Sequence, residues 1–427
     1  MAKKQRVEFN ARDYSEPLMD SYKFNCDKYK ILRIYQTPSG LWIKDAETFV
    51  ERFLRIKYFL REHLANHCVK EVISDLKSLC FKDIEFPKPD WSLIPFSNGV
   101  YNLRTKEFSE FQPDYHFISK LAVNYNPKIQ DCPFIDKVFR EFVKPKNISD
   151  LYELAAYCMV STYANQEIYF LVGAGRNGKS VYTHILTRFL GTDNISSVCL
   201  HDLQTNRFAG AELYGKFANI SAELRYSDLN NTDQIKKLSG GDMVYAERKF
   251  QHPFSFENYA KLIFVTNELP KTDDKTQAFY RRARVIPFPN VFEGKKENKL
   301  LREKITAQEL EGLAFKCVNI LQEMIGRGFT FTNQKQTAEI EQEYEALSNP
   351  ITTFIEQQCL IGDEEEYFIT KDGFRKRLDG WLRSTSQRIR KDKEIAQYMK
   401  ERGVCDEKKS IVPAKRKNCW VGIKWKE

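Results

Sequence analysis

The sequence predicts an α/β protein in which a parallel β-sheet stands between a mainly helical N-terminal domain and a small basic C-terminal domain. Three short apolar runs predict the sheet, and they occupy residues 168–175, 216–224 and 260–269. Each run has the length of a buried parallel strand, and segments with helical spacing of apolar residues separate them. A chain of 427 residues is also long enough for several domains.

Changes of pattern along the chain predict its division into domains. The N-terminal domain is expected to be mainly helical with a small hairpin, because residues 46–80 place apolar side chains three and four positions apart and a turn-rich stretch follows at 86–108. The predicted segments are 1–148 (N-terminal domain), 149–293 (sheet), 294–348 (helical segment) and 349–427 (basic domain). The third of these segments is expected to begin with a charged connector and to continue as helices.

Composition indicates a globular protein. The hydrophobic share of 42% and the aromatic share of 13% exclude a wholly disordered or collagen-like chain. No stretch approaches the roughly 18 uncharged apolar residues that a membrane-spanning helix needs, and the opening segment lacks the apolar core of a signal peptide. A cytoplasmic location in the host cell is therefore expected.

The ten cysteines include no C-x-x-C pair, and most lie in apolar runs, so we expect reduced core thiols. The alternative is a metal site at His63, His67, Cys68 and Cys80, because two histidines four positions apart share one face of a helix. The spacing of a zinc finger is missing there, which favours structural thiols.

Positive charge is concentrated at one end of the chain. The formal net charge is +9, and residues 371–427 hold 18 Lys and Arg against 8 Asp and Glu. The basic residues form clusters at 375–377, 388–391 and 415–417, and Trp420 and Trp425 follow the last cluster like the wing of a winged helix. This end of the chain is therefore expected to contact a polyanion. The alternative is a solvated basic face around a core that contains the two tryptophans.

A glycine-rich loop follows the first apolar run. It matches the full G-x-x-x-x-G-K-S pattern in a strand–loop–helix setting. In such a loop the backbone N–H groups surround the phosphates of a nucleotide, the lysine reaches the β- and γ-phosphates, and the serine hydroxyl binds Mg²⁺. A structural glycine turn is the alternative. The predicted nucleotide-binding residues are Gly173, Ala174, Gly175, Arg176, Asn177, Gly178, Lys179, Ser180 and Val181.

Two polar residues at strand ends fit the chemistry of hydrolysis. Glu223 follows the second apolar run, where its carboxylate would orient and deprotonate the attacking water and contribute with Ser180 to the Mg²⁺ site. Asn267 follows the third run, and its amide would hold the same water or the γ-phosphate. The alternatives are that Glu223 caps the next turn and that Asn267 is an ordinary turn residue.

Three arginines, Arg281, Arg282 and Arg284, precede an apolar segment. A guanidinium stabilises the charge on a transferring phosphoryl group, and in ring ATPases the neighbouring subunit supplies it. Arg282 is the predicted arginine finger, because it lies 15 residues after Asn267, and Arg281 and Arg284 are the other candidates. A solvated charged face is the alternative.

A predicted hairpin lies between the second and third runs. A glycine turn at 240–241 is followed by a β-prone stretch that ends in Arg248, Lys249 and Phe250. Two basic side chains beside an aromatic ring are typical of proteins that bind single strands of nucleic acid, through phosphates and bases respectively. The alternative is a surface hairpin with solvated charges.

The order of these motifs resembles the superfamily 3 helicases, which are AAA+ ring ATPases of small DNA viruses, phages and plasmids. In detail it is similar to the helicase half of phage/plasmid and poxvirus-type primase-helicases, over about residues 90–345. The upstream segments 98–105 and 124–127 also resemble the domain that precedes this ATPase. The motifs that match are the loop 173–180, SAE at 221–223, the hairpin 240–250, FVTN at 264–267 and YRRARVIPF at 280–288.

The resemblance implies an AAA+ core and an ATP-dependent DNA helicase that uses Mg²⁺. It further implies a homohexameric ring that threads one strand of single-stranded or forked DNA and moves 3′→5′ in the replication of a phage, virus or plasmid-like element. The basic end is expected to be a winged-helix-like DNA-binding domain.

Two features depart from that family. Ala222 precedes Glu223 where many members carry a second acidic residue. Residues 1–150 show no pair of metal-binding carboxylates of the primase type, so a primase is expected as a separate partner or within a longer chain. Two other functions remain open: an ATP-regulated replication initiator with weak unwinding, and a small-molecule P-loop kinase.

Overall fold

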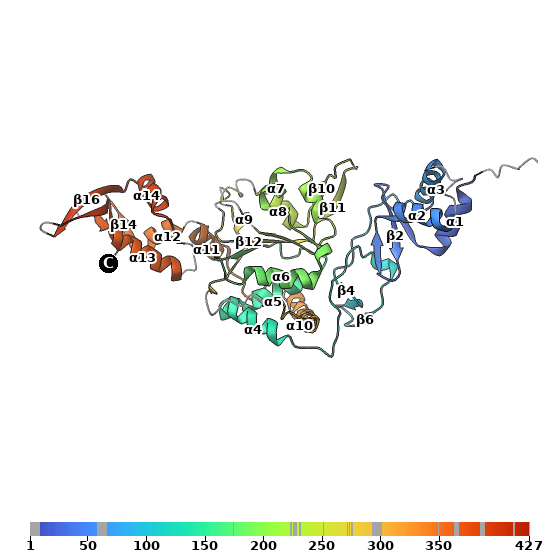
Figure 1. Ribbon diagram of the computed structural model, residues 1–427, viewed down its shortest axis with the longest axis horizontal. Coiled ribbons are helices and arrows are strands. Elements are labelled where there is room, and N and C mark those ends of the chain that lie inside the picture. Colours follow the sequence, from blue (N-terminus) through green and yellow to red (C-terminus); the bar gives the residue numbers. More distant parts are fainter. Residues whose placement is uncertain are drawn as a thin grey trace, which may run out of the picture.

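The computed structural model describes residues 9–57, 66–173, 175–222, 224, 229, 232–250, 252–270, 272, 274, 276–292, 301–348, 350–362, 367–384, 389–412 and 415–426. An N-terminal unit, a central α/β unit and a C-terminal unit follow one another along the longest axis of the molecule (Figure 1).

The centre of the molecule is a five-stranded sheet in which every neighbouring pair of strands is parallel. The three apolar runs form three adjacent strands, β7, β12 and β9, so the predicted α/β class with a parallel sheet is confirmed. In spatial order the strands are β13 (Ala283–Pro287), β7 (Ile168–Val172), β12 (Lys261–Thr266), β9 (Ala218–Ala222) and β8 (Ile195–Ser196).

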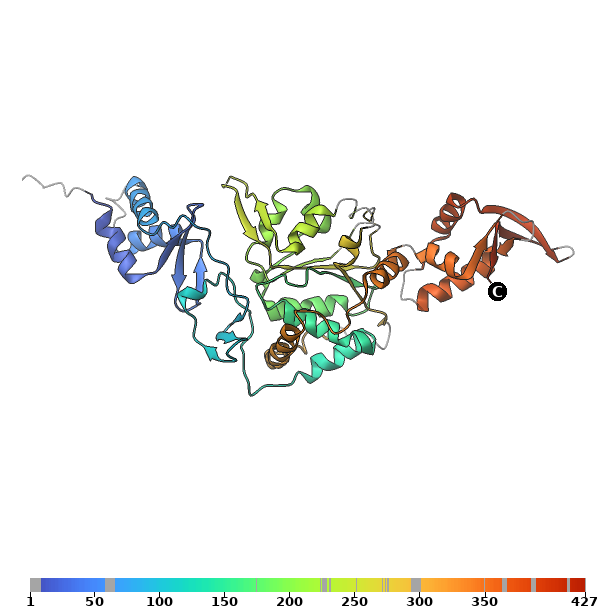
Figure 2. The same ribbon diagram turned by 180° about the vertical axis from the view of Figure 1, so that it is seen from behind.

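Side chains of the sheet alternate between two layers of helices, as strand geometry requires. Tyr169 and Leu171 of β7 face one layer, whereas Phe170 and Val172 face the other. The first layer contains α4 (Pro133–Phe142), α5 (Ile148–Tyr157), α6 (Lys179–Leu190) and α10 (Ala307–Gly326). The second contains α7 (Leu200–Thr205), α8 (Asp233–Gly240), α9 (Gln277–Tyr280) and α11 (Thr337–Ser348). Figure 2 shows from behind that α4, α5 and α10 lie on the same side of the sheet.

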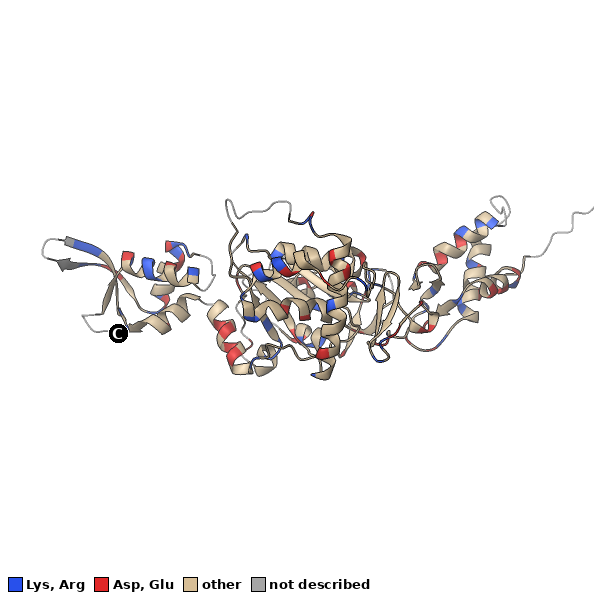
Figure 3. Ribbon diagram, turned by 90° about the horizontal axis from the view of Figure 1, so that it is seen from below, with Lys and Arg blue, Asp and Glu red and all other residues tan. Residues whose placement is uncertain are grey.

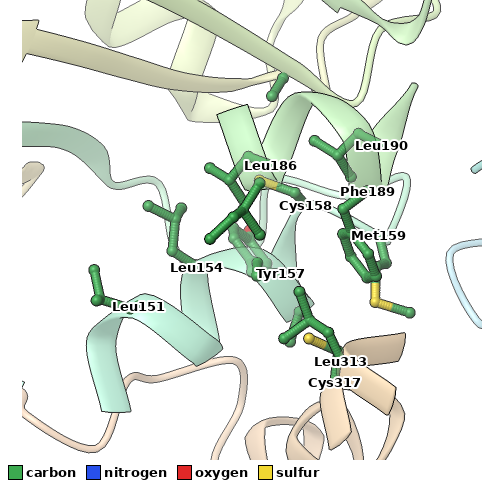
Figure 4. Close-up of a cluster of buried hydrophobic side chains, with 14 of the residues drawn as sticks. Leu151, Leu154, Tyr157, Cys158, Met159, Leu186, Phe189, Leu190, Leu313 and Cys317 are labelled. Atoms are coloured by element: carbon green, nitrogen blue, oxygen red, sulfur yellow. The ribbon is translucent and has the colours of Figure 1, made fainter. Parts of the chain in front are cut away.

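The first layer is a dense apolar core that supports α6. Leu154 of α5, Phe189 of α6 and Leu313 of α10 meet in this core, and each is fully buried (Figure 4). Because close-packed interiors resist local displacement, the core holds α6 and the loop before it in a fixed position under the sheet.

The N-terminal unit contains two three-stranded antiparallel sheets beside its helices, where the sequence predicted one small hairpin. The strands of the first sheet are only three to five residues long, which is too short for apolar periodicity to indicate them. The elements are α1 (Arg12–Ser21), β1 (Phe24–Cys26), β2 (Leu32–Gln36), β3 (Leu41–Ile43), α2 (Ala46–Lys57), α3 (Asn66–Leu79), β4 (Leu93–Phe96), β5 (Gly99–Asn102) and β6 (Phe108–Ser109).

The described residues of the C-terminal unit form three helices and two small antiparallel sheets around a core of their own. Trp420 is 5% exposed, and the ring of Trp425 stacks on Phe374 with the ring centroids 6.0 Å apart. Both tryptophans are therefore part of this core. The elements are α12 (Pro350–Gln358), β14 (Cys359–Ile361), β15 (Phe368–Thr370), α13 (Lys371–Ser384), α14 (Asp392–Glu401), β16 (Cys405–Val412), β17 (Lys415–Val421) and β18 (Ile423–Trp425).

All ten cysteines are free thiols, and eight of them are buried. Among the described residues no three His, Cys, Asp or Glu side chains come together in a way that could hold a metal ion, and His63 lies outside that part of the chain. Within the same residues, every helix is too short or too polar to cross a membrane.

Candidate functional site

The glycine-rich loop connects β7 to α6 at the carboxyl end of the sheet. The backbone N–H of Gly173 donates to the carbonyl oxygen of Thr266 at 3.3 Å, which ties the loop to β12. The side chain of Asn177 donates to the carbonyl oxygen of Phe288 at 3.1 Å, which ties it to the segment after β13. The loop is therefore anchored to both strands that flank β7.

Gly178 lies immediately before α6, in a conformation and a close contact that require glycine. Its φ of 91° lies in the left-handed region, and a Cβ atom there would approach the ring of Phe142 to 2.3 Å. No other residue fits this conformation and this close contact with α4. The turn lets the first backbone N–H groups of α6 face the cavity in front of the loop, where the helix dipole favours an anion.

Lys179 is held between the loop and the end of β12. Its side chain is buried, and Nζ donates to the carbonyl oxygen of Gly173, to Oδ1 of Asn177 at 2.9 Å and to Oδ1 of Asn267 at 3.4 Å. All three acceptors are neutral. Burial lowers the pKa of Lys179 to about 8. Lys179 and Asn267, which the sequence placed in separate motifs, are thus in contact.

A cavity of about 870 Å³ lies in front of the loop. Predicted residues form one side of it, namely Gly175, Arg176, Asn177, Gly178, Lys179, Ser180, Val181 and Asn267. The other side was not predicted, because α4 and the segments after β13 supply it. These additional lining residues include Phe134, Lys137, Glu141, Phe142, Phe292, Leu301 and Lys304. The volume and the mixed aromatic and polar lining are typical of cofactor sites.

The residues present fit a nucleoside triphosphate. The site combines a buried ammonium group, a turn that accepts only glycine, and the amino end of a 12-residue helix. Ala174 and Glu223 lie outside the described residues, so their predicted roles stay predictions. The two residues that flank Glu223, Ala222 and Leu224, line the same cavity.

The three arginines that precede the last apolar segment occupy three different environments. Arg284 is buried and donates to both carboxylate oxygens of Glu167 at 2.6 and 2.7 Å, and to Asp150 at 3.3 Å. Arg282 is 8% exposed, and its guanidinium donates to the carbonyl oxygen of Ala278 at 2.7 Å. Arg281 is exposed. Arg284 therefore has a structural role, which leaves Arg281 and Arg282 as candidate fingers.

These arginines stand at the amino end of β13, away from the glycine-rich loop. Strand β13 runs parallel to β7, and Ala283 pairs with Ile168 whereas Pro287 pairs with Val172, the last residue before the loop. Five residues of strand span about 16 Å. Neither candidate finger reaches the cavity of its own chain across that distance.

The predicted hairpin is present as β10 (Met243–Ala246) and β11 (Phe254–Glu257). At its tip Lys249 is exposed and Phe250 is 94% exposed, as strand-binding residues would be. Arg248 is placed differently from Lys249 and Phe250. Its guanidinium lies 4.9 Å from the centroid of the Phe254 ring and donates to the carbonyl oxygen of Ala211 at 3.3 Å, so it packs against the first residue of β11 instead of pointing into solvent.

The hairpin also exposes a residue that the motif did not indicate. Along β10 exposed and buried side chains alternate, so Tyr245, which is 59% exposed, lies on the outer face. The sequence could not indicate this outer face, because all four residues of β10 are apolar.

An ion pair connects the C-terminal unit to the cavity. Arg390 is buried and contacts a carboxylate oxygen of Glu268 at 2.7 Å. Glu268 follows Asn267 and lines the cavity. The sequence assigned Arg390 to a basic cluster that contacts a polyanion, but its guanidinium faces inward.

Other basic residues of the C-terminal unit are also used internally. Arg375 pairs with Asp379 at 2.9 Å and Asp392 at 2.6 Å, and Arg377 lies 4.3 Å from the ring centroid of Trp425. Further Lys and Arg residues lie on α13, on α14 and on the β16–β17 hairpin (Figure 3). The exposed ones there include Lys391, Lys393, Lys400, Lys408, Arg416 and Lys417.

Two family models match the chain. The model described as D5 N terminal like matches residues 24–144, and a family of unknown function, DUF5906, matches residues 171–282. A solved structure, the apo C-terminal region of NrS-1, is similar with a TM-score of 0.48 and 12% identity over 96% of this chain and 98% of that chain.

Several viral proteins are similar in sequence. A putative helicase of Acanthamoeba polyphaga mimivirus is 28% identical over 223 residues, which cover 47% of this chain and 22% of the relative. A putative helicase of Invertebrate iridescent virus 6 is 24% identical over 320 residues, 64% of this chain and 32% of the relative. Primase D5 of fowlpox virus is 24% identical over 294 residues, 60% of this chain and 36% of the relative. The chain thus spans a fifth to about a third of these proteins' lengths, and the matches support a D5-type primase-helicase family.

Proposed function

We propose that this chain is the ATP-dependent DNA helicase module of a replication protein of a virus, phage or plasmid-like element. The observation that carries the proposal is the position of Lys179, whose ammonium group is buried among neutral oxygens and faces the large cavity. A buried cation without an anionic partner is costly, and a triphosphate bound in front of it would relieve that cost.

Some residues around the cavity would bind ATP and Mg²⁺, and others would take part in hydrolysis. The N–H groups of the loop and Lys179 would hold the phosphates of ATP, and Ser180 with Glu223 would hold Mg²⁺. The ion would neutralise charge on the β- and γ-phosphates when bound. Glu223 would accept the proton of the attacking water, and Asn267, already in contact with Lys179, would orient that water or the γ-phosphate.

The location of the arginines supports assembly as a ring. Because Arg281 and Arg282 lie about 16 Å of strand away from their own loop, a finger in this segment would serve the cavity of a neighbouring subunit. A homohexamer of AAA+ type that moves 3′→5′, as the superfamily 3 resemblance implies, would provide this arrangement.

DNA would be contacted at two places. The exposed Lys249 and Phe250 would hold a single strand through a phosphate and a base, and Tyr245 offers a further ring on the same hairpin. The order of helices and the long β16–β17 hairpin of the C-terminal unit fit a winged-helix-like domain, whose exposed basic residues would contact duplex or forked DNA by charge. A primase, separate or on a longer chain, is the expected partner.

Turnover and unwinding test this proposal. Lys179→Ala is expected to abolish ATP hydrolysis, and Glu223→Gln to retain bound ATP without hydrolysing it, whereas the matched surface variant Lys128→Ala should behave as wild type. Arg282→Ala subunits are expected to be inactive alone and to regain partial activity when mixed with Lys179→Ala subunits, because finger and loop would come from different chains.

A replication initiator, in which ATP governs assembly and unwinding is weak, is the alternative. The two functions differ on forked DNA, where a helicase releases a strand during ATP hydrolysis and an initiator hydrolyses slowly and releases none. Near-normal ATPase in Lys179→Ala would refute both. A small-molecule P-loop kinase would leave the exposed hairpin tip and the exposed basic residues of the C-terminal unit without a role.

A further inference from the structure

A second cavity, of about 140 Å³, lies between the N-terminal unit and the base of the β10–β11 hairpin. Its lining includes Arg33 of β2, Lys44 after β3, Tyr214, and Phe254 of β11. We propose that this cavity binds one backbone phosphate of the DNA strand that the hairpin contacts, through Lys44 and Arg33 with Arg248 beside them. The inference rests on the proposed function and adds to it a phosphate site that involves the N-terminal unit.

Most charges around this cavity neutralise one another. Arg33 pairs with Asp27 at 2.6 Å and Lys28 with Glu85 at 2.9 Å, and a third ion pair joins a lysine and a glutamate at the rim, Lys88 and Glu257. Within the described residues Lys44 and Arg248 have no such carboxylate partner at ion-pair distance. Among the described lining residues, Lys44 is therefore the cation left without a carboxylate at ion-pair distance, and Arg248 adds a second such cation beside the cavity.

These two cations share one aromatic surface. Nζ of Lys44 lies 4.2 Å from the centroid of the Tyr214 ring and 5.8 Å from that of Phe254, and the guanidinium of Arg248 lies 4.9 Å from the Phe254 centroid. Ring faces attract a cation, but they do not remove the repulsion between two of them. An anion between Lys44 and Arg248 would stabilise both.

Arg33 supplies a hydrogen-bond donor that is still unused. The residue is 1% exposed, and its Nε has no hydrogen-bond partner, although its two terminal nitrogens contact Asp27 and the hydroxyl of Tyr214. Buried donors are nearly always satisfied in native proteins. A phosphate oxygen in the cavity would provide an acceptor.

The size and position of the cavity favour a phosphate of a strand over a free nucleotide. A volume of about 140 Å³ is below the range of roughly 300–1,000 Å³ that small-molecule sites occupy, yet it suffices for a phosphate group. Arg248 adjoins Lys249 and Phe250 in the exposed tip of the hairpin. A strand stacked on Phe250 would therefore continue along the hairpin toward Arg248 and Lys44.

Lys44 gives the site a measurable signature. Desolvation by burial, together with Arg248, Arg33 and Lys216, lowers the pKa of Lys44 to about 7, and Asp27 only partly opposes this. A bound phosphate would favour the charged amine, so binding would take up a proton wherever the free amine is neutral. For a pKa near 7 the uptake is about 0.9 proton at pH 8 and about 0.1 at pH 6.

Binding of a fluorescent single-stranded oligothymidylate to the full chain would test the inference. Anisotropy from pH 6.5 to 8.5 would measure the affinity, and calorimetry in buffers of different ionisation enthalpy would measure the proton uptake. Wild type should bind about fifteenfold more weakly at pH 8.5 than at pH 7, with the proton uptake given above. Lys44→Met should bind more weakly at pH 6.5 and take up no proton at this site. Lys44→Arg, which keeps its charge, should restore affinity and remove the pH dependence, and Lys128→Met is the matched control.

The outcomes separate the two proposals. If wild type bound no oligothymidylate at any pH, the proposed function would fail. If wild type bound it and Lys44→Met kept the same affinity and pH dependence, with thermal melting showing that both were folded, the phosphate site would be refuted. If Lys44→Met weakened the binding of inorganic phosphate but not of the oligonucleotide, the cavity would be a site for free phosphate and the strand assignment would be wrong.

Discussion

Replacement of Arg284 by methionine tests whether this residue stabilises the fold or takes part in catalysis. The Arg284 side chain is 8% exposed, and it neutralises the carboxylates of Glu167 and Asp150, which are 6% and 3% exposed. Removing one partner of a buried ion pair leaves an uncompensated charge, at a cost of about 3–5 kcal/mol in the free energy of unfolding. We therefore expect Arg284→Met to lower the unfolding free energy by that amount.

The dependence on pH follows from Glu167. Burial raises the pKa of Glu167 even with Arg284 present, so its carboxyl binds a proton more readily in the folded chain than in the unfolded one. A raised carboxyl pKa contributes stability at low pH that is lost as the pH rises. Without Arg284 this shift grows, so the loss in Arg284→Met should be smaller at pH 5 than at pH 8.

Urea denaturation at both pH values measures this effect. The double variant Arg284→Met/Glu167→Gln should be more stable than the single variant Arg284→Met, because one of the two stranded charges is gone. If Arg284→Met changed the unfolding free energy by less than about 1 kcal/mol and nevertheless abolished ATP hydrolysis, the structural assignment would be refuted and Arg284 would be the finger.

Three further predictions concern the proposed nucleotide site. Under the proposed function the ammonium form of Lys179 holds phosphate. Because the pKa of Lys179 is about 8, affinity for a fluorescent ATP analogue should fall about tenfold per pH unit above pH 8, and a flat profile to pH 9.5 would contradict this. Gly178→Ala should abolish binding of the same analogue. The control variant is Gly241→Ala, because φ is also positive there, at 80°, but no atom stands where the added Cβ would lie. It should lower the free energy of unfolding, measured by urea denaturation, by only about 1 kcal/mol. Arg390→Met should lower steady-state ATP turnover severalfold because it removes the ion pair between Arg390 and Glu268, and unchanged turnover would show that this ion pair is only structural.

The central strands were predictable because a strand that is buried on both faces consists mainly of apolar residues. Strands β7, β9 and β12 lie inside the sheet and appear in the sequence as short, nearly uninterrupted apolar runs. Strand β13 was not predicted, because it is an edge strand that contains an arginine and ends in a proline. The strands of the first N-terminal sheet are too short for any period to emerge.

The part of the candidate site formed by the glycine-rich loop was predictable, because its sequence motif corresponds to one backbone conformation. A G-x-x-x-x-G-K-S loop after a buried strand has a known conformation, and Asn267 could be placed beside it because parallel strands end at a common edge. The wall formed by α4 could not be predicted. Phe142 meets Gly178 through tertiary packing across 36 residues of sequence, and no local pattern encodes that contact.

Clusters of basic residues carried the least information, because their roles depend on partners far away in the sequence. Arg284 and Arg390 each belong to a basic run, yet their carboxylate partners, Glu167 and Glu268, lie 117 and 122 residues away. Removal of residues 350–427 would therefore do more than reduce DNA affinity, because it would also remove the Arg390 ion pair of Glu268, which adjoins Asn267. Substitutions of exposed basic residues on the β16–β17 hairpin, such as Lys417→Ala, leave that ion pair intact. They are the changes that would isolate the contribution of the C-terminal unit to DNA binding from its effect on the nucleotide site.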